Sequence, residues 1–136
     1  MITDFIDEIK DFLVSNTSLV FGTDLFIGTM PDTIENSVLL VNSTDPEYTY
    51  SMNEKFGYTE YNITIVIRGN EKENETRALA NTITDVLENL NSQILGSFTL
   101  IRGKFSAPLS QLEQRDDNDN FIYTGNYQSI IEWKEQ

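Results

Sequence analysis

The sequence of 136 residues contains no cysteine and no histidine. Without cysteine there is no disulfide framework, no thiolate metal site and no thiol nucleophile. Without histidine there is no Ser-His-Asp triad, no imidazole metal ligand and no histidine switch near neutral pH. These absences exclude the commonest catalytic and metal-binding arrangements, and we expect neither enzymatic activity nor a cofactor.

Basic residues are also scarce, because 9 Lys and Arg stand against 22 Asp and Glu, for a formal net charge of −13. A protein that wraps nucleic acid needs Lys and Arg to replace the counterions of the phosphates, so this composition argues against that function. The longest purely apolar run is Val38–Val41, far short of the roughly 20 residues that span a bilayer. The early Asp4, Asp7 and Glu8 do not fit a signal peptide, which begins cationic and then turns apolar. We expect a soluble protein inside the cell, without a membrane segment.

Two segments carry apolar residues at helical spacing and are predicted to be amphipathic helices. The first covers about Asp4–Ser15 and the second about Glu71–Asn91. Asn70 with Glu73 three residues later resembles a capping box at the start of the second helix. The apolar stripe of that helix consists of Leu79, Ile83, Val86, Leu87 and Leu90.

Five segments are predicted to be strands from their apolar or alternating residues and from the turn residues that bound them. Val38–Val41 has no alternation, which indicates a strand covered on both faces. A bulge is expected at Arg102-Gly103, while Pro108 is expected to end the fourth strand and Gly125 to interrupt the fifth. The predicted strands are Leu25–Thr29, Ser37–Asn42, Tyr61–Arg68, Phe98–Phe105 and Phe121–Trp133.

The predicted order α-β-β-β-α-β-β indicates one α+β domain over residues 1–136. We expect two layers, with about five strands in a mixed or antiparallel sheet and both helices packed on one face. The sheet would be mixed if the second helix crossed over between parallel neighbours.

An aromatic segment follows the turn at Asp45-Pro46 and extends to Tyr58. It could form a long hairpin arm whose rings either fold back over the open end of the core or make a contact surface, since Tyr, Phe and Met are favoured at interfaces. The apolar strand Val38–Val41 also favours assembly, because its second face needs a cover from this chain or from a neighbouring subunit. The residues predicted to contact a subunit or a partner are Tyr48, Tyr50, Met52 and Phe56.

The segment Asp116–Asn120 resembles the start of a calcium-binding EF-hand loop. Its sixth position is Phe121 where Gly is needed, and its twelfth is Tyr127 where Glu is needed, so the pattern fails and no metal site is predicted. A solvated turn between two strands is the simpler interpretation. The acidic residues assigned to this loop are Glu113, Asp116, Asp117 and Asp119.

Taken in order along the chain, several short motifs form a recognisable pattern. They are Gly28-Thr29-Met30-Pro31-Asp32, Val38–Val41 before Asp45-Pro46, Arg68-Gly69 before a helix with Ala78-Leu79-Ala80, and Ala107-Pro108 before Tyr123 and Asn126-Tyr127. In this order the sequence resembles the tail terminator (tail completion) proteins of long-tailed bacteriophages, sometimes labelled minor capsid proteins, over nearly its whole length. It departs from them where Asn118–Asn120 replace the Gly-Arg that often precedes the last strand.

The resemblance implies a non-enzymatic structural protein of the virion, assembled in the host cytoplasm and placed at the interface of head and tail. It implies a homo-oligomer, a hexameric ring, that binds the tail tube protein, ends tube polymerisation and offers a docking surface to the head-completion (stopper) protein. DNA would pass through the ring without specific binding, and acidic side chains in the lumen would repel its phosphates. In this ring the aromatic residues would contact a subunit or the tube, and the acidic loop would lie at the lumen or rim.

Two other functions stay open at this stage. Another connector or stopper subunit of the head-tail junction would share the acidic character but contact the portal side. A monomeric acidic protein that mimics DNA would need carboxylates along one face at phosphate-like spacing, whereas here they are dispersed over the helices and one turn.

Overall fold

The computed structural model describes residues 5–29, 35–42, 47–50, 56–88, 90–95, 98–112 and 120–134. In 47–50, 56–59 and 133–134 it describes the backbone. The helices are α1 (Phe5–Asn16) and α2 (Glu73–Leu87). The strands are β1 (Leu25–Ile27), β2 (Ser37–Asn42), β3 (Glu47–Tyr50), β4 (Phe56–Arg68), β5 (Leu90–Leu95), β6 (Phe98–Gln111) and β7 (Ile122–Lys134).

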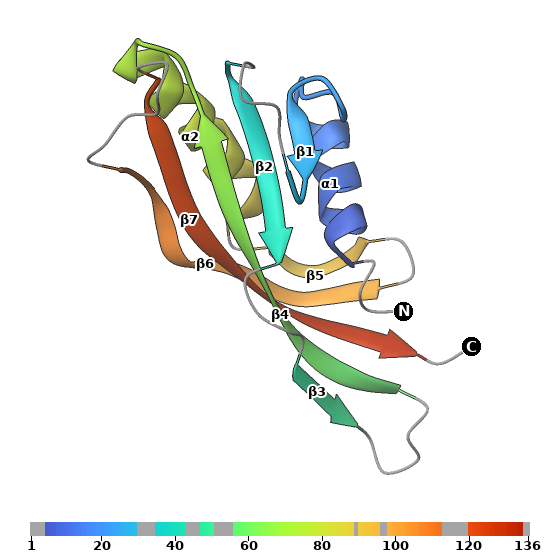
Figure 1. The fold of residues 1–136 in the computed structure, drawn as a ribbon. Helices are drawn as coiled ribbons and strands as arrows, with labels where there is room; N and C mark the ends of the chain where they lie inside the picture. The colour runs from blue at the N-terminus through green and yellow to red at the C-terminus, as the bar shows by residue number, and fades with distance from the viewer. Residues whose placement is uncertain are drawn as a thin grey trace.

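The seven strands within the described ranges form one twisted sheet, in the order β1-β2-β4-β7-β6-β5 (Figure 1). β3 lies off this path and pairs with β4, next to the pairing of β4 with β2. β4 and β7 pair along their whole lengths, from Phe56 opposite Lys134 to Arg68 opposite Ile122. The α+β class is therefore confirmed, but the prediction of about five strands in the order α-β-β-β-α-β-β is wrong.

The sheet is mixed, although not for the predicted reason. β1 and β2 pair in parallel, and every other pair of neighbouring strands named here is antiparallel. The second helix does not cross between parallel neighbours. It leads from β4 to β5, and β5 is not a neighbour of β4 because it pairs with β6 at the edge of the sheet. The parallel neighbours are instead β1 and β2, which follow each other in the sequence.

Both helices pack on one face of the sheet, as predicted. From Glu60 to Arg68 of β4 the side chains alternate, so that every second one is buried under the helices while its neighbours are half-buried on the opposite face. Buried residues of α1 and α2 and the inward side chains of β4 belong to one hydrophobic cluster. The inward side chains of β4 are Tyr61, Ile63, Ile65 and Ile67. Two layers around a single core follow from this arrangement.

The first helix forms where the apolar spacing predicts it, within one residue at each end. Its buried residues are Phe5, Ile6, Ile9 and Leu13. Acidic residues occupy its first turn, where the helix dipole favours negative charge. At the other end the Asn16 side-chain amide donates to the Phe12 carbonyl at 2.8 Å, and the Thr17 hydroxyl donates to the Leu13 carbonyl at 2.6 Å.

The second helix is shorter than predicted at both ends. It ends at Leu87, because Glu88 has an extended backbone. Leu90 fits the apolar spacing of the helix, yet it begins β5 and lies opposite Gly103 in the sheet. The predicted capping box is also wrong, since the N-cap is Lys72 and makes no side-chain cap hydrogen bond.

β6 is longer than predicted, and β7 is shifted by one residue from its predicted range and has no interruption. β6 continues past Pro108 to Gln111, and β7 runs through Gly125 without a break. The register of β6 against β7 shifts between Leu100 and Arg102, next to the predicted bulge, and twice more between Phe105 and Ser110. Pro108 falls inside this irregular stretch, where the absence of its N–H leaves no regular ladder position unpaired.

Tyr127 connects the end of α2 to β7. Its hydroxyl donates to the Leu87 carbonyl at 2.6 Å, and its ring packs edge-on against Phe105 at a centroid distance of 5.1 Å. Burial raises the pKa of the Tyr127 phenol, so the hydroxyl stays protonated and remains a donor. The terminal turn of the helix is thereby tied to the sheet beneath it.

Candidate assembly interface

The predicted aromatic contact residues belong to an arm of the sheet. β3 and the start of β4 pair antiparallel, with Tyr48 opposite Thr59 and Tyr50 opposite Gly57, and they extend away from the helical layer (Figure 1). Phe56 is the first residue of β4 and lies opposite Lys134. The side chains of Tyr48, Tyr50 and Phe56, and all of Met52, lie outside the described residues. The hairpin arm is confirmed, and its role as a contact surface stays a prediction.

The predicted acidic loop also lies outside the described residues. Glu113, Asp116, Asp117 and Asp119 fall in the range 113–119. The described residues on either side of that range are hydrogen-bonded to each other, because the Leu112 N–H donates to the Ile122 carbonyl at 2.9 Å. The loop therefore connects the paired strands β6 and β7, and its place at a lumen or rim stays a prediction.

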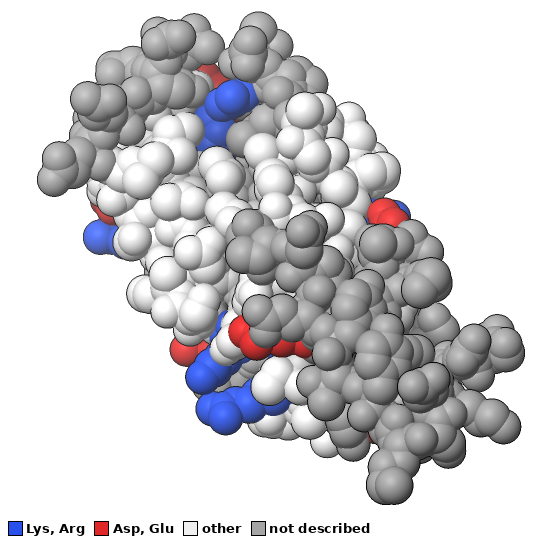
Figure 2. Space-filling view, turned by 60° about the horizontal axis from the view of Figure 1, so that its bottom comes forward, with Lys and Arg blue, Asp and Glu red and all other residues white. Residues whose placement is uncertain are grey.

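The part of the outer sheet face that β2 and the middle of β4 form carries no charged side chain among the described residues. Leu39 lies opposite Val66, and Val41 lies opposite Thr64, so that apolar and small polar side chains are neighbours across β2 and β4. These side chains are half-buried, whereas Val38 and Leu40 on the inner face are fully buried. The second face of β2 thus lacks the full cover predicted for it. Figure 2 shows a broad area without charged side chains, with both basic and acidic side chains at its border.

An exposed apolar turn follows α1 and was missed by the sequence reasoning. Val20 and Phe21 are 55% and 50% exposed. The turn is held rigid, because the Val20 N–H donates to Asp24 Oδ1 at 2.6 Å and the Thr23 and Asp24 N–H groups donate to the Val20 carbonyl at 3.1 Å. Gly22 has the positive φ of +88° that this turn requires. The sequence signal for it is the apolar run Leu19-Val20-Phe21 beside Gly22.

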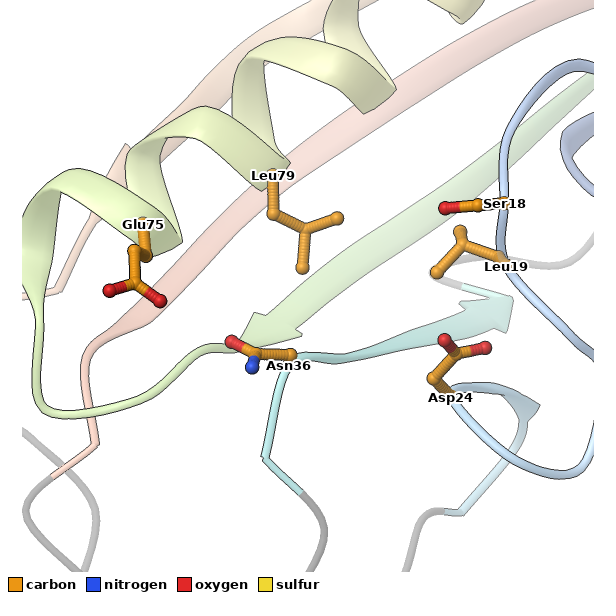
Figure 3. A pocket seen from close by; sticks show the side chains of 6 residues that line it. All are labelled: Ser18, Leu19, Asp24, Asn36, Glu75 and Leu79. Carbon is orange, nitrogen blue, oxygen red and sulfur yellow. The ribbon is translucent and has the colours of Figure 1, made fainter.

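A pocket of about 270 Å³ opens between α2, the start of β2 and the segment after α1 (Figure 3). Both carboxylates of its lining hold hydrogen bonds within the chain, since Asp24 Oδ1 accepts from the Val20 N–H and Glu75 Oε1 accepts from the Asn70 amide. The lining holds no nucleophile paired with a base, so it offers no arrangement for catalysis. The residues that line it are Ser18, Leu19, Asp24, Asn36, Glu75 and Leu79.

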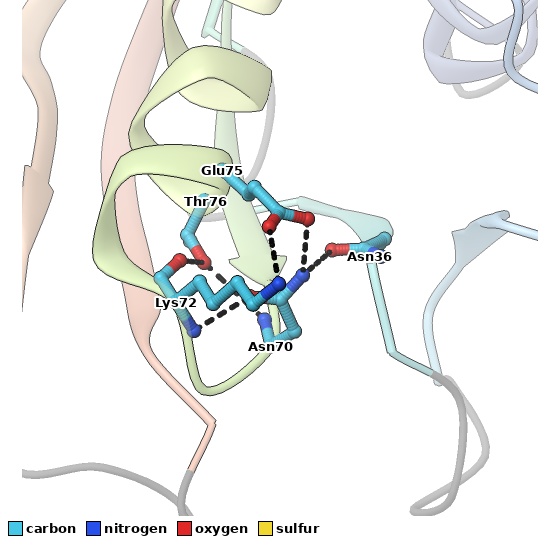
Figure 4. A network of polar contacts seen from close by, with 5 residues as sticks. All are labelled: Asn36, Asn70, Lys72, Glu75 and Thr76. Carbon is cyan, nitrogen blue, oxygen red and sulfur yellow. Dashed lines mark hydrogen bonds and ion pairs between the residues drawn. The ribbon is translucent and has the colours of Figure 1, made fainter.

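Asn70 organises the neighbouring junction of four elements (Figure 4). Its side-chain oxygen accepts from the Lys72 N–H at 2.7 Å, and its amide donates to Asn36 Oδ1 at 3.3 Å and to Glu75 Oε1 at 3.2 Å. Its backbone carbonyl accepts from the Phe121 N–H at 3.0 Å. Asn70 is largely buried and therefore joins four elements, namely the start of β2, the end of β4, the start of α2 and the start of β7.

Replacing Asn70 by alanine should lower the free energy of unfolding by about 1–2 kcal/mol, because three partners of its side chain lose a hydrogen bond. Urea denaturation followed by circular dichroism measures this change. Asn74→Ala is the matched control, since Asn74 is exposed on the first turns of α2 and should change stability by less than about 0.5 kcal/mol. Equal stability of the two variants would show that the junction does not depend on Asn70.

Three properties of the described residues bear on the class of function. Among them there is no group of three or more His, Cys, Asp or Glu side chains placed to hold a metal ion. No helix in the described part of the chain has the length and apolarity needed to cross a bilayer. The features that stand out are an uncharged area on the outer sheet face, an extended arm and an exposed apolar turn, and exposed apolar surface is typical of interaction sites.

Comparisons with known proteins agree with this interpretation. The model of the family described as bacteriophage tail terminator protein matches residues 12–133. A chain in the solved structure titled "Virion of native gene transfer agent (GTA) particle" shares the fold, with a TM-score of 0.56 and 15% sequence identity over 82% of this chain and 80% of that chain. No curated protein sequence gave a match. Because the family model covers nearly the whole chain, this protein belongs to the bacteriophage tail terminator family and is a structural protein of the virion tail.

Proposed function

We propose that this tail protein forms a ring that caps the tail tube, ends tube polymerisation and provides the docking surface for the head. The observation that carries the proposal is the family match over residues 12–133. The fold supports it, because exposed apolar residues, among them Val20, Phe21 and Ile94, lie outside the hydrophobic core. Such surfaces in a small protein favour contacts with other subunits.

A ring needs two different surfaces on each subunit, because each copy must bind the one before it and the one after it. The candidate surfaces are the outer sheet face, the turn at Val20-Phe21 and the arm with Tyr48, Tyr50, Met52 and Phe56. The remaining surface is then available for the tube protein on one side of the ring and the head-completion protein on the other. We place the acidic loop around Asp116 at the lumen or rim, where it would repel passing DNA.

The test combines oligomeric state with tube growth. Native mass spectrometry of the purified chain, alone and with its tail tube protein, should give closed oligomers, with a hexamer as the expected size. Electron microscopy of growing tubes should show shorter tubes with a distinct cap at one end when the chain is added. A chain that stays monomeric beside its tube protein, with unchanged tube length, contradicts the proposal.

A role as another connector or stopper subunit is the second candidate, because the acidic composition, with a net charge of −13, suits any component through which DNA passes. Co-purification separates the two functions. Recovery of the tube protein supports the terminator, whereas recovery of portal-side proteins without the tube protein supports the connector.

A further inference from the structure

Two basic side chains stand free on the outer face of β6. Arg102 lies opposite Ile130 and Lys104 lies opposite Gln128 in the pairing with β7, so all four point away from the helices. Arg102 and Lys104 are exposed, and neither forms an ion pair among the described residues. Glu60 on the same face is hydrogen-bonded to Gln128 instead. The sheet face therefore offers two adjacent positive charges without a partner in the described part of the chain.

Two acidic side chains without an ion pair among the described residues lie in the helical layer, where α2 ends. Asp85 and Glu88 are exposed, and the last turn of the helix holds no basic residue. Negative charge is unfavourable there, because the helix dipole is negative at its C-terminal end. The cations of α2 lie near its other end, where Lys72 pairs with Glu75 at 3.4 Å and Arg77 pairs with Glu73 at 3.7 Å. A cation supplied from outside the chain would relieve this unfavourable charge.

The basic pair on β6 and the acidic pair at the end of α2 have opposite charges and similar spacing. Residues two apart on one strand, such as Arg102 and Lys104, are separated by about 7 Å. Glu88 caps the helix, and its N–H still donates to the Thr84 carbonyl at 2.8 Å. Its Cβ therefore keeps the position of a residue three along the helix from Asp85, about 5–6 Å away. The sheet itself separates the two pairs within one chain, because α2 packs on the inner face and the cations lie on the outer face. Only a different copy can bring them together.

We propose that a second copy of this chain docks head to tail on the outer sheet face, with Asp85 and Glu88 of one copy against Arg102 and Lys104 of the next. The two surfaces differ, so the contact is heterologous and can close into a ring. Ile130, exposed beside Arg102, adds apolar area to the contact. The exposed residues Ala78, Asn81 and Thr82 of α2 have short side chains, which lets this helix approach a sheet closely. The inference rests on the proposed ring and specifies its subunit interface.

Charge reversal tests the contact. The sheet variant carries Arg102→Glu and Lys104→Glu, and the helix variant carries Asp85→Lys and Glu88→Lys. Alone, each variant should need a subunit concentration higher by about tenfold or more to assemble, because like charges now meet at every interface. Mixed in equal amounts, the two variants should form rings, since each reversed surface meets its complement on the other variant. Native mass spectrometry should show even-numbered rings that contain equal numbers of the two variants.

Matched controls separate the position of the charges from their number. Asp7→Lys with Asp11→Lys changes the charge of α1 as much as the helix variant changes α2, and Lys10→Glu with Lys72→Glu, outside the proposed contact, matches the charge change of the sheet variant. Both controls should assemble at the concentration that the unmodified chain requires. Circular dichroism checks that every variant is folded.

The outcomes distinguish this inference from the proposed ring. If the unmodified chain stays monomeric beside its tube protein, the ring itself is wrong. If the unmodified chain forms rings and both reversal variants assemble equally well, the ring stands and this interface is wrong. Single variants that fail to assemble and are not rescued by mixing also overturn the interface, because complementary pairing then plays no part.

Discussion

Replacing Gly125 by alanine should destabilise the fold by about 3 kcal/mol or more, the upper range for an added atom in a closely packed site. The new Cβ would lie 2.8 Å from the Ala107 carbonyl oxygen, 2.9 Å from the Leu109 nitrogen and 3.0 Å from the Leu109 Cα. All three are backbone atoms of β6, so no side chain can rotate away to make room. Urea denaturation followed by far-UV circular dichroism measures the loss of unfolding free energy.

The neighbouring residue Asn126 supplies a control for this substitution. It is exposed on β7, and its side-chain oxygen accepts from the Thr64 hydroxyl at 2.9 Å. Asn126→Ala should therefore cost only about 1 kcal/mol, the contribution of an ordinary hydrogen bond. If Gly125→Ala is no more destabilising than Asn126→Ala, β6 does not pass as close to Gly125 as described.

Gly125 and Pro108 show why the two last strands could not be predicted in full. Each residue separately indicates a break in a strand, so the sequence predicts a break at each. The structure joins them in one feature, because the irregular stretch of β6 that contains Pro108 passes directly over the glycine. The proline avoids the regular ladder and the glycine makes room for it. The pairing that explains both residues connects positions far apart in the sequence, so local pattern alone does not reveal it.

The core was predictable where periodicity was strong. The alternation of Tyr61–Arg68 correctly identifies the inward face of β4, and the apolar stripe of α1 correctly identifies its buried residues. β5 was missed because Leu90 satisfies helical spacing and strand pairing equally well. Its strand conformation depends on the contact with β6, which only the tertiary structure supplies.

The assembly surfaces were less predictable than the core. The uncharged second face of β2 follows from its lack of alternation, and the family follows from the order of short motifs along the chain. The free cations Arg102 and Lys104 gave no sequence signal, because their isolation depends on which residues of β7 lie opposite them. Exposure of Phe21 likewise depends on the hydrogen bonds that fold its turn outward.

Replacing Phe5 by alanine should lower the free energy of unfolding by about 3–5 kcal/mol, the range for truncating a buried aromatic side chain. Phe5 is fully buried at the first residue of α1. Its ring lies edge-on to Tyr61 of β4 at a centroid distance of 5.3 Å and to Phe98 of β6 at 5.6 Å. The substitution therefore leaves a cavity where the helix meets two strands, and it removes two aromatic contacts as well as buried area.

Two further variants show whether this loss comes from packing at the start of α1. Val14→Ala changes an exposed residue of the same helix and should cost less than about 1 kcal/mol. Phe5→Leu refills most of the cavity and should recover more than half of the stability lost in Phe5→Ala, because cavity volume sets much of the cost. Thermal and urea unfolding of the three variants give the comparison. Equal stability of Phe5→Ala and Val14→Ala would mean that α1 is not anchored to the sheet through Phe5, and the two-layer core would have to be closed by other residues of the helix.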